Sequence, residues 1–299
     1  MAWLVGSGKT RSRVMITRFA PSPTGPLHLG HAYSAIVAHD LARGQGGAFL
    51  LRIEDIDRSR ARETWEQQIY DDLSWLGLQW DAAPVRQSDH LTRYRSALNE
   101  LWCSGYLYPC NCRRADIAAA VNAPQEGAPL LGPDGVIYPR LCYVPTTHHS
   151  RVADDMPSDA VLRLDMTAAV AALEVDKTPI TYTNNGAPVQ ITAPQLVNTV
   201  GDVVLARRDM GTSYHLSVVV DDAAQGITDV VRGEDLESAT AIHVVLQRLL
   251  NLPTPQYHHH RLIRDDAGKR LAKRDDARAL SNYRAQGLSS ADIRRLIGL

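Results

Sequence analysis

Apolar and polar residues along the first third of the chain follow a pattern that predicts strands and helices in turn. Runs rich in β-branched and aromatic residues indicate strands, and apolar positions at helical spacing that end at glycines indicate helices. The predicted elements are a strand over Val14–Phe19, a helix over Leu29–Gln45, a strand over Ala48–Ile53, and helices over Arg62–Leu76 and His90–Ser104. This order favours an α/β fold with a parallel sheet of the kind that binds nucleotides.

The second half of the chain is predicted to be richer in strands. We expect a β-rich region over Val161–Leu205, an apolar run over Tyr214–Val220, a strand over Ile227–Val231, a helix over Ser238–Leu250, and a hairpin over Gln256–Ile263 that turns at Asp266–Gly268. We interpret the three histidines from His258 to His260 as strand residues, because neighbours in a strand point to opposite faces and cannot all reach one metal ion.

Composition places the chain among folded globular proteins. Its 299 residues are 44% hydrophobic and 22% charged, a length that suggests about two modules. No apolar run approaches the ~20 residues that a membrane span needs. We therefore expect a cytoplasmic protein with no membrane partner. We also expect it to be a monomer.

Charge is unevenly distributed along the chain. The formal net charge is -1, yet residues 261–299 contain ten Lys or Arg against five Asp. This local excess of +5 is compatible with two interpretations: a surface that faces phosphates, or an ordinary solvated helical surface. Charge alone leaves both open.

The four cysteines do not form a disulfide scaffold, since the chain is long and shows no secretory signal. Cys110 and Cys112 are separated by one residue, and Cys142 follows a stretch rich in Gly and Pro. Cys103 lies apart from them, in a helical pattern. We interpret the first three as candidate metal ligands, with reduced buried cysteines and no metal as the alternative.

The segment after the first strand, Pro21–His31, carries the clearest motif. Its end reads His28, Leu29, Gly30, His31 at a predicted strand-to-helix turn. Imidazole N–H groups at a helix N-terminus can donate to phosphate oxygens, and a glycine lets a nucleotide approach the backbone closely. The motif resembles the first signature of class I glutamyl-tRNA synthetases. The resemblance implies a class I Rossmann-type catalytic domain in which His28, Gly30 and His31 bind ATP and the two histidines are also catalytic residues.

A second motif, Arg270–Arg274, resembles the lysine-centred signature of the same family. Arginine stands where the family usually has its first lysine, and Ala272 where it has serine. Lys273 aligns with the second lysine. Its ammonium can neutralise charge that develops on the phosphates in the transition state, so the resemblance implies a catalytic and ATP-binding role.

The resemblance also implies a pocket for L-glutamate. It is carried by Leu51–Asp57, by Tyr214–Asp222, which resembles the family's second substrate strand, and by Arg232. Glu54 would bind the ammonium of glutamate and Arg18 its side-chain carboxylate, although Glu54 and Arg232 could instead form a structural ion pair. The implied pocket residues are Arg18, Phe19, Ala20, Pro21, Ser22, Glu54, Tyr214 and Arg232.

Only about 25 residues follow the second signature, so we expect no anticodon-binding domain. The chain therefore resembles the truncated branch of the family, the glutamyl-queuosine tRNA(Asp) synthetases. The implied partners are ATP with Mg(II), L-glutamate and queuosine-containing tRNA(Asp). A glutamyl-tRNA synthetase that acts on tRNA(Glu) and a catalytically silent RNA-binding or regulatory paralogue are the alternatives.

The same branch implies one structural Zn(II) per chain, held by Cys110, Cys112, Tyr138 and Cys142, with His148 or His149 as chemical substitutes for the tyrosine. The expected organisation begins with an N-terminal extension and ends with the lysine-signature loop and a truncated stem-contact region. The expected boundaries are 1–12 for the extension, 13–105 for the first half of the catalytic domain, and 106–204 for the zinc-containing insertion. The second half of the catalytic domain is expected over 205–255, and the final region over 256–299.

Overall fold

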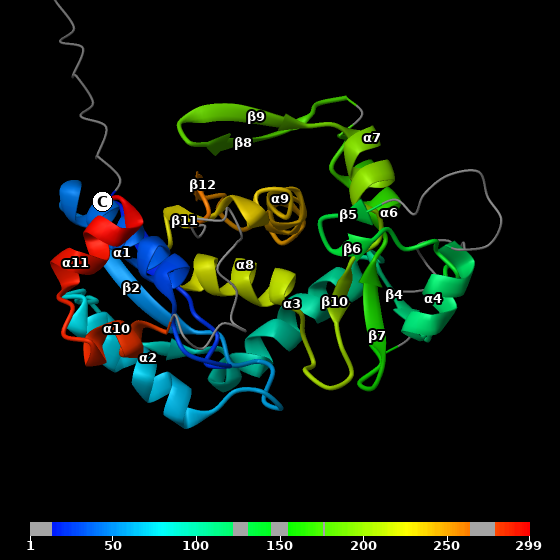
Figure 1. Cartoon of the computed structure of the whole chain (residues 1–299). Helices are drawn as coiled ribbons and strands as arrows, with labels where there is room; N and C mark the ends of the chain where they lie inside the picture. Colours follow the sequence, from blue (N-terminus) through cyan, green and yellow to red (C-terminus); the bar gives the residue numbers. More distant parts are fainter. Residues whose placement is uncertain (1–13, 122–130, 145–154, 176, 264–278) are drawn as a thin grey trace, which may run out of the picture.

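The structure is a computed structural model that describes residues 14–121, 131–144, 155–175, 177–263 and 279–299. Figure 1 shows a parallel sheet flanked by helices on one side of the molecule and a smaller antiparallel sheet on the other. The strands of the first third match the prediction closely, with β1 at Ile16–Phe19 and β2 at Ala48–Ile53. The helices of this part are α1 (Leu29–Gly44), α2 (Glu63–Trp75) and α3 (Leu91–Cys103).

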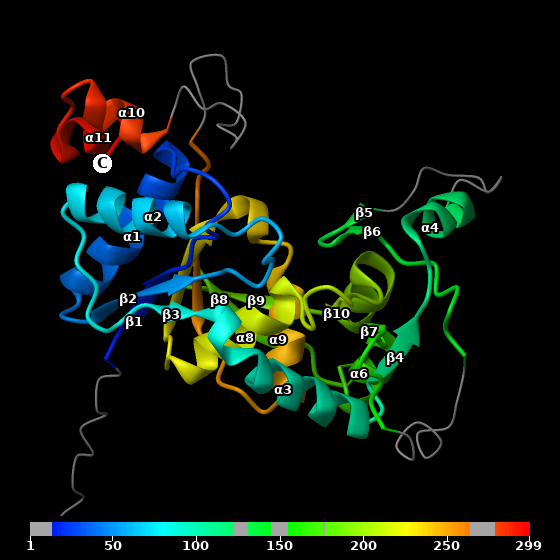
Figure 2. The ribbon, with the colours of Figure 1, turned by 90° about the horizontal axis from the view of Figure 1, so that it is seen from below.

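The parallel sheet is built from two sets of strands that meet at β1. On one side β1 pairs with β2 and β2 with β3 (Val85–Arg86). On the other side lie β11 (Asp229–Gly233) and β12 (Gln256–His260), which pair in parallel. The Thr228 amide donates to the Ile16 carbonyl at 2.9 Å, so β11 begins beside β1. The strand order therefore reverses between β1 and β11. Figure 2 shows β1, β2 and β3 together on one side of the molecule, away from β4 and β7.

A hairpin from the middle of the chain completes this half of the sheet. β8 (Ile180–Asn184) pairs with β12 in parallel and with β9 (Ala187–Ile191) antiparallel. The hairpin lies within the 106–204 range, yet it joins the sheet of the second catalytic half rather than the antiparallel sheet. β12 pairs in parallel with both β8 and β11, and residues 271–274, just past the predicted turn, lie outside the described residues. The predicted turn at 266–268 lies outside the described residues.

The apolar run that begins at Tyr214 forms a helix, α8 (Tyr214–Ala224), so its resemblance to a substrate strand was wrong. Ser213 caps this helix by accepting a hydrogen bond from the Leu216 amide. Every residue of α8 from His215 to Asp222 is buried. A helix that is buried on nearly all sides has no clear polar face, which is why its short run of valines looks like a buried strand. Helix α9 (Thr240–Leu249) lies near its predicted range and packs in the same hydrophobic core as α8.

The antiparallel sheet has the order β10-β7-β4 and lies at the right of Figure 1. The β-rich region predicted here also contains a helix, α6. The elements of this part are β4 (Leu107–Cys110), α4 (Arg114–Val121), β5 (Leu131–Gly132), β6 (Gly135–Val136), β7 (Val161–Leu164), α6 (Met166–Ala172), α7 (Ala193–Gln195), a π-helical turn (Leu196–Val200) and β10 (Val204–Ala206).

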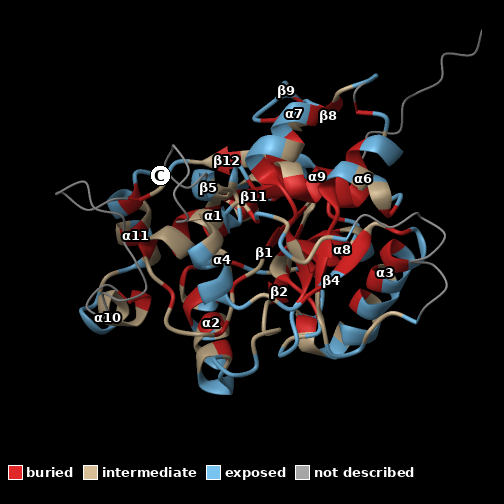
Figure 3. Ribbon diagram, turned by 90° about the vertical axis from the view of Figure 1, so that its right-hand side faces the viewer, coloured by how far each residue is buried: buried red, intermediate tan, exposed pale blue. Residues whose placement is uncertain are grey.

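Two large hydrophobic cores hold these layers together. One is built around α3, α8 and α9, and the other around α1, α2 and β2. Figure 3 shows buried residues concentrated in α8 and α9. In the part of the chain that the structure describes, no helix is long and apolar enough to cross a membrane.

The basic C-terminal segment packs back onto the catalytic half. Its helices α10 (Leu280–Ala285) and α11 (Ser290–Ile297) bury Leu280, Ile293 and Ile297 in the core around α1. Arg294 donates two hydrogen bonds to Asp40 of α1, at 2.6 and 3.1 Å, and Arg295 pairs with Asp292. Carboxylates of the protein thus engage both arginines of α11.

Candidate active site

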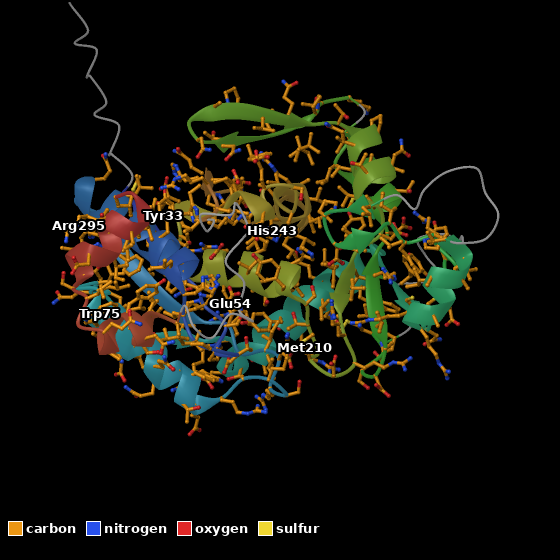
Figure 4. The ribbon with its side chains drawn as sticks, in the orientation of Figure 1. Tyr33, Glu54, Trp75, Met210, His243 and Arg295 are labelled. Atoms are coloured by element: carbon orange, nitrogen blue, oxygen red, sulfur yellow. The ribbon has the colours of Figure 1, made fainter. Side chains whose placement is uncertain are left out.

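A cavity of about 620 Å³ opens where the strand order reverses, at the carboxyl ends of β1 and β11. In open α/β sheets this crevice is the usual place for a ligand, because the loops leave the strands in opposite directions there. Figure 4 shows Glu54 in the middle of the molecule, whereas Trp75 and Arg295 lie at its left-hand edge.

The cavity unites the described residues of the predicted site. Two parts of the chain that are far apart in the sequence, residues 18–54 and 214–263, contribute to its wall, so the pocket exists only in the folded protein. Its lining includes Arg18, Phe19, Ala20, Pro21, Ser22, His28, Gly30, His31, Glu54, Tyr214 and Arg232. Lys273 and the whole second signature, residues 270–274, lie outside the described residues.

The two imidazoles of the first signature cap helix α1. His28 is the N-cap, and its Nδ1 accepts from the Gly30 amide at 3.1 Å. Nδ1 of His31 accepts from the His28 amide at 3.2 Å, which completes a capping box made of histidines. A neutral imidazole that accepts at Nδ1 carries its hydrogen at Nε2. Both rings are therefore set as Nε2–H donors at the positive end of a helix, which suits a phosphate.

Arg18 is held by a carboxylate from a distant helix. Its Nε and Nη2 donate to the two oxygens of Asp222 at 2.9 and 3.3 Å, and its Nη1 donates to the Val231 carbonyl at 3.3 Å. Asp222 also accepts from Arg52 at 2.7 Å. Burial opposes ionisation of Asp222, but the guanidiniums of Arg18 and Arg52 hold its pKa below the usual range. The charge of Arg18 is therefore largely compensated by the protein itself.

Glu54 also lies beside Arg52, whose Nη2 donates to it at 3.1 Å. Burial raises the pKa of Glu54, and Arg52 and Arg18 act against this shift. The ion pair with Arg232 that the sequence left open is not seen among the described residues, where Arg52 is the partner of Glu54. A buried carboxylate that faces the cavity is a suitable acceptor for an ammonium group.

The neighbouring residue Asp221 binds three further side chains to α8. It accepts from Gln87 at 2.9 Å, from Arg93 at 3.1 Å and from the Tyr94 hydroxyl at 2.7 Å. Two neighbouring aspartates of one helix thus hold different groups: Asp222 holds Arg18 of the pocket wall, and Asp221 holds side chains that do not line the cavity. Sequence reasoning gave neither aspartate a role, although two acids at the end of an apolar run are a signal, since buried carboxylates need partners.

Arg232 is held differently from Arg18, by neutral groups. Its Nε donates to Nε2 of His259 at 3.1 Å, its Nη1 to Nδ1 of His243 at 3.0 Å, and its Nη2 to the Thr240 hydroxyl at 2.7 Å. Among the residues that the structure describes, no carboxylate lies within ion-pair distance of this arginine. The sequence pattern pointed to neither histidine as a partner of Arg232, since His259 was expected only as a strand residue and His243 only as part of a helix.

The two residues that flank the segment 264–278 lie at the pocket. Ile263 lines the cavity, and Ala279 forms a β-bridge with His28. The Leu280 amide donates to the Leu27 carbonyl at 2.8 Å, one residue before His28 in the first signature. The chain thus leaves the pocket wall at residue 263 and returns to the first signature at residue 279.

The cysteine cluster lies outside this pocket, at the end of β4. The sulfur atoms of Cys110, Cys112 and Cys142 lie within 4.8 Å of one another. The Tyr138 hydroxyl is 3.4 Å from the Cys110 sulfur and 3.2 Å from the Cys112 sulfur, and it accepts from the Cys142 amide at 2.8 Å. The Arg163 guanidinium stacks on the Tyr138 ring at 3.7 Å. The four predicted ligands are therefore gathered in one place.

The chemistry of this donor set fits a metal ion. Burial opposes ionisation of Cys142, but hydrogen bonds from Cys112 and from the Asn111 amide lower its pKa to about 7, whereas burial raises the pKa of the Cys112 thiol to about 11. A thiol with the pKa of Cys142 is partly ionised at neutral pH, as a metal ligand must be. The three cysteines can thus bind a metal. The alternative ligands His148 and His149 lie outside the described residues.

Comparisons with known proteins agree with this geometry. The model of the family "tRNA synthetases class I (E and Q), catalytic domain" matches residues 14–299. The chain is 62% identical to a glutamyl-Q tRNA(Asp) synthetase of Rhodobacter capsulatus over 95% of this chain and 100% of that protein. It is 40% identical to one of Geobacter sulfurreducens, over 89% of this chain and 78% of that protein.

The solved structures are similar over a shorter share of their length. A glutamate tRNA ligase from Elizabethkingia meningosepticum in complex with its amino acid matches with a TM-score of 0.69 and 28% identity, over 88% of this chain and 52% of that one. This chain thus spans about half the length of that solved ligase. The chain belongs to the class I tRNA synthetases of the E and Q type and, within them, to the glutamyl-Q tRNA(Asp) synthetase family.

Proposed function

We propose that this protein activates L-glutamate with ATP and transfers the glutamyl group to the queuosine base in the anticodon of tRNA(Asp). The single observation that carries the proposal is the cavity at the carboxyl ends of β1 and β11. It places a histidine-capped helix N-terminus next to a buried carboxylate and two arginines. Such a pocket has donors for phosphates and partners for each charge of glutamate.

Glu54 and Arg18 are the proposed ligands of the amino acid. Glu54 binds the substrate ammonium and Arg18 binds the side-chain carboxylate, while Tyr214 and Arg232 close the pocket. The backbone and side chains from Phe19 to Ser22 form the remaining wall. These assignments are supported by the common cavity and by the partners of each side chain.

Activation needs no general base, since the α-carboxylate of glutamate is already ionised at neutral pH. Its oxygen attacks the α-phosphorus of ATP, the bond to the β-phosphate oxygen breaks, and pyrophosphate leaves. ATP enters as its Mg(II) complex. His28 and His31 donate from Nε2 to the phosphates, and Gly30 leaves room for them beside the backbone. The glutamyl-adenylate then reacts with a hydroxyl of the queuosine cyclopentenediol, which gives an ester and releases AMP.

Lys273 is the proposed cation for the charge that develops on the phosphates. The flanks of its segment support this role, because residue 263 lies in the pocket wall and residue 279 at His28. Fifteen residues, 264–278, lie between these two points in the sequence.

A structural Zn(II) is the proposed occupant of the cysteine cluster. Three thiolates and the Tyr138 oxygen can complete a tetrahedral shell, and a closed shell of four protein ligands leaves no position for a substrate. When bound, the ion would hold β4 and the segment around Cys142 together. The cluster lies outside the proposed catalytic pocket, so its role is to support the fold.

The test separates the RNA target from the activation step. Radiolabelled glutamate is incubated with ATP and, in parallel, with queuosine-containing tRNA(Asp), with tRNA(Asp) that lacks queuosine, and with tRNA(Glu). Label is expected only on the first RNA, because the other two lack the cyclopentenediol nucleophile. Glutamate-dependent pyrophosphate exchange is expected without any RNA.

Each alternative has its own result. Label at the 3′ end of tRNA(Glu) would favour a glutamate–tRNA ligase. A protein of Acidothermus cellulolyticus with that name is 37% identical to this chain, over 94% of this chain and 54% of that protein. Equal label on both forms of tRNA(Asp) would contradict the queuosine assignment. Binding of ATP and tRNA without pyrophosphate exchange would favour the silent paralogue.

A further inference from the structure

The buried histidines around Arg232 have no role in the reaction as proposed above. His243 and His259 are each less than a tenth exposed, and His215 lies behind His243. Figure 4 shows His243 in the middle of the molecule, in the region of α9. Three imidazoles in contact with one arginine or with each other are costly to bury unless their hydrogens are arranged so that donors meet acceptors.

Arginine fixes that arrangement, because a guanidinium can only donate. Nδ1 of His243 must accept from Arg232, so its hydrogen is at Nε2 and is donated to Nδ1 of His215 at 3.2 Å. His215 in turn carries its hydrogen at Nε2, which lies 3.4 Å from a carboxylate oxygen of Asp134. A single directed chain of hydrogen bonds therefore leads from Arg232 to the turn between β5 and β6.

The other side of Arg232 follows the same rule. Nε2 of His259 accepts from the arginine Nε, so its Nδ1–H donates to Oδ1 of Asn184 at 2.7 Å. The amide of Asn184 donates to Glu237 at 2.8 Å. Every ring nitrogen in both chains has a consistent role only when both histidines that touch Arg232 are neutral.

The charged surroundings keep these rings neutral. Burial lowers the pKa of His243 well below its usual value, and the nearby Arg232 lowers it further. Burial and the same arginine lower the pKa of His259 to about 3. A protonated ring at either position would turn an N–H toward a guanidinium N–H. The histidines therefore accept from Arg232 without contributing a negative charge.

We propose that His243 and His259 are positioning residues that orient Arg232 in the pocket and leave its positive charge available to a carboxylate of the substrate. Arg18 shows the contrast, since Asp222 pairs with it and reduces the attraction it can offer to an anion. A carboxylate in place of either histidine would hold the guanidinium equally well but would neutralise it. The inference rests on the proposed function, which makes glutamate the substrate.

The experiment compares His243→Gln with His243→Glu, two side chains of nearly equal size that differ in charge. Glutamine can accept from Arg232 through its oxygen, so the KM for glutamate in pyrophosphate exchange is expected to rise only about threefold. The glutamate side chain forms a buried pair with Arg232, and the KM is expected to rise by roughly 30-fold or more. The KM for ATP should change little in both variants.

Further variants keep the test decisive if His243→Glu does not fold. His259→Gln and His259→Glu form the same pair on the other side of Arg232, and thermal denaturation checks that each variant is folded. His258→Gln is the matched control, since His258 neighbours His259 in β12 but pairs with Asp229 outside the pocket. Its KM for glutamate should equal that of the parent protein.

The outcomes separate this inference from the proposed function. Equal effects of the Gln and Glu substitutions at both positions would overturn the inference, because charge would then not matter. Imidazole ¹⁵N resonances that show His243 protonated at Nδ1 would overturn it as well. A parent protein that does not activate glutamate would instead refute the proposed function, and the ¹⁵N result would still report whether Arg232 is held by neutral rings.

Discussion

The catalytic pocket and the cysteine cluster are both polar sites, but they are stabilised in opposite ways. In the pocket the side chains of Arg18 and Arg52 are almost fully buried and are paired with Asp222 by the fold itself. In the cluster two of the three cysteines are partly exposed, and only Tyr108, Cys110 and Tyr138 form its buried core. The pocket is thus preorganised by internal charge balance, whereas the cluster gathers three cysteines that could bind a metal, and the proposed zinc ion would complete it.

The strongest way to break the comparison is to remove the charge balance of the pocket. Asp222→Ala leaves Arg18 and Arg52 buried without their shared partner, which we expect to cost about 3–5 kcal/mol in the free energy of unfolding. Urea denaturation measures the loss. Asp40→Ala is the control, because its pair with Arg294 is exposed and should contribute about 0–1 kcal/mol. Equal losses would mean that burial of the charges is not what matters.

Removal of the proposed transition-state cation tests the pocket at its second signature. Lys273→Ala is expected to lower glutamate-dependent pyrophosphate exchange by about 10²-fold or more, with little change in stability. Lys177→Ala serves as the control, since Lys177 forms an exposed pair with Glu174 away from the pocket. An equal rate in Lys273→Ala and the parent protein would remove this lysine from the mechanism.

The cysteine cluster is tested by its metal content. The parent protein should purify with about one equivalent of zinc, and Cys110→Ser should release it and loosen residues 105–145 while activation persists. Cys103→Ser is the matched control, because Cys103 is exposed and lies outside the cluster. Metal analysis by mass spectrometry and hydrogen exchange measure the two effects.

Two results would revise the metal site. Freshly prepared, reduced parent protein without zinc would contradict the site as a whole. Full zinc occupancy in Tyr138→Phe would contradict only the fourth ligand, and a nearby histidine or a water molecule would then complete the shell.

The smallest expected effect is a pH dependence of the KM for glutamate, which would report the ionisation of Glu54 in the pocket. Burial raises the pKa of Glu54, so this carboxylate becomes protonated at a higher pH than an ordinary glutamate does. The neutral form attracts the substrate ammonium less, so the KM for glutamate should rise as the pH falls through that raised pKa, by roughly tenfold per unit well below it. Steady-state exchange at several pH values measures this. Glu54→Gln should bind glutamate more weakly and lose this dependence.

Local features were predictable from the sequence because they depend on neighbours. The turn from β1 to α1, the helix that starts at the first signature, and strand β2 all lie within a few residues of their predicted limits. The metal-ligand spacing of Cys110 and Cys112 is equally local. Helix propensity, glycine stops and ligand spacing act over one or two turns, so the residues themselves carry the information.

By itself, the sequence determined the family signatures, the order of elements in the first half and the identity of the candidate ligands. Only the tertiary structure decided which groups share a site: Asp222 meets Arg18 across 204 residues, and His259 meets Arg232 across 27. It also made Tyr214–Ala224 a helix, since a segment buried on all sides has no amphipathic period to report. Pairing between distant residues depends on how the sheet and helices pack, and no local pattern records that choice.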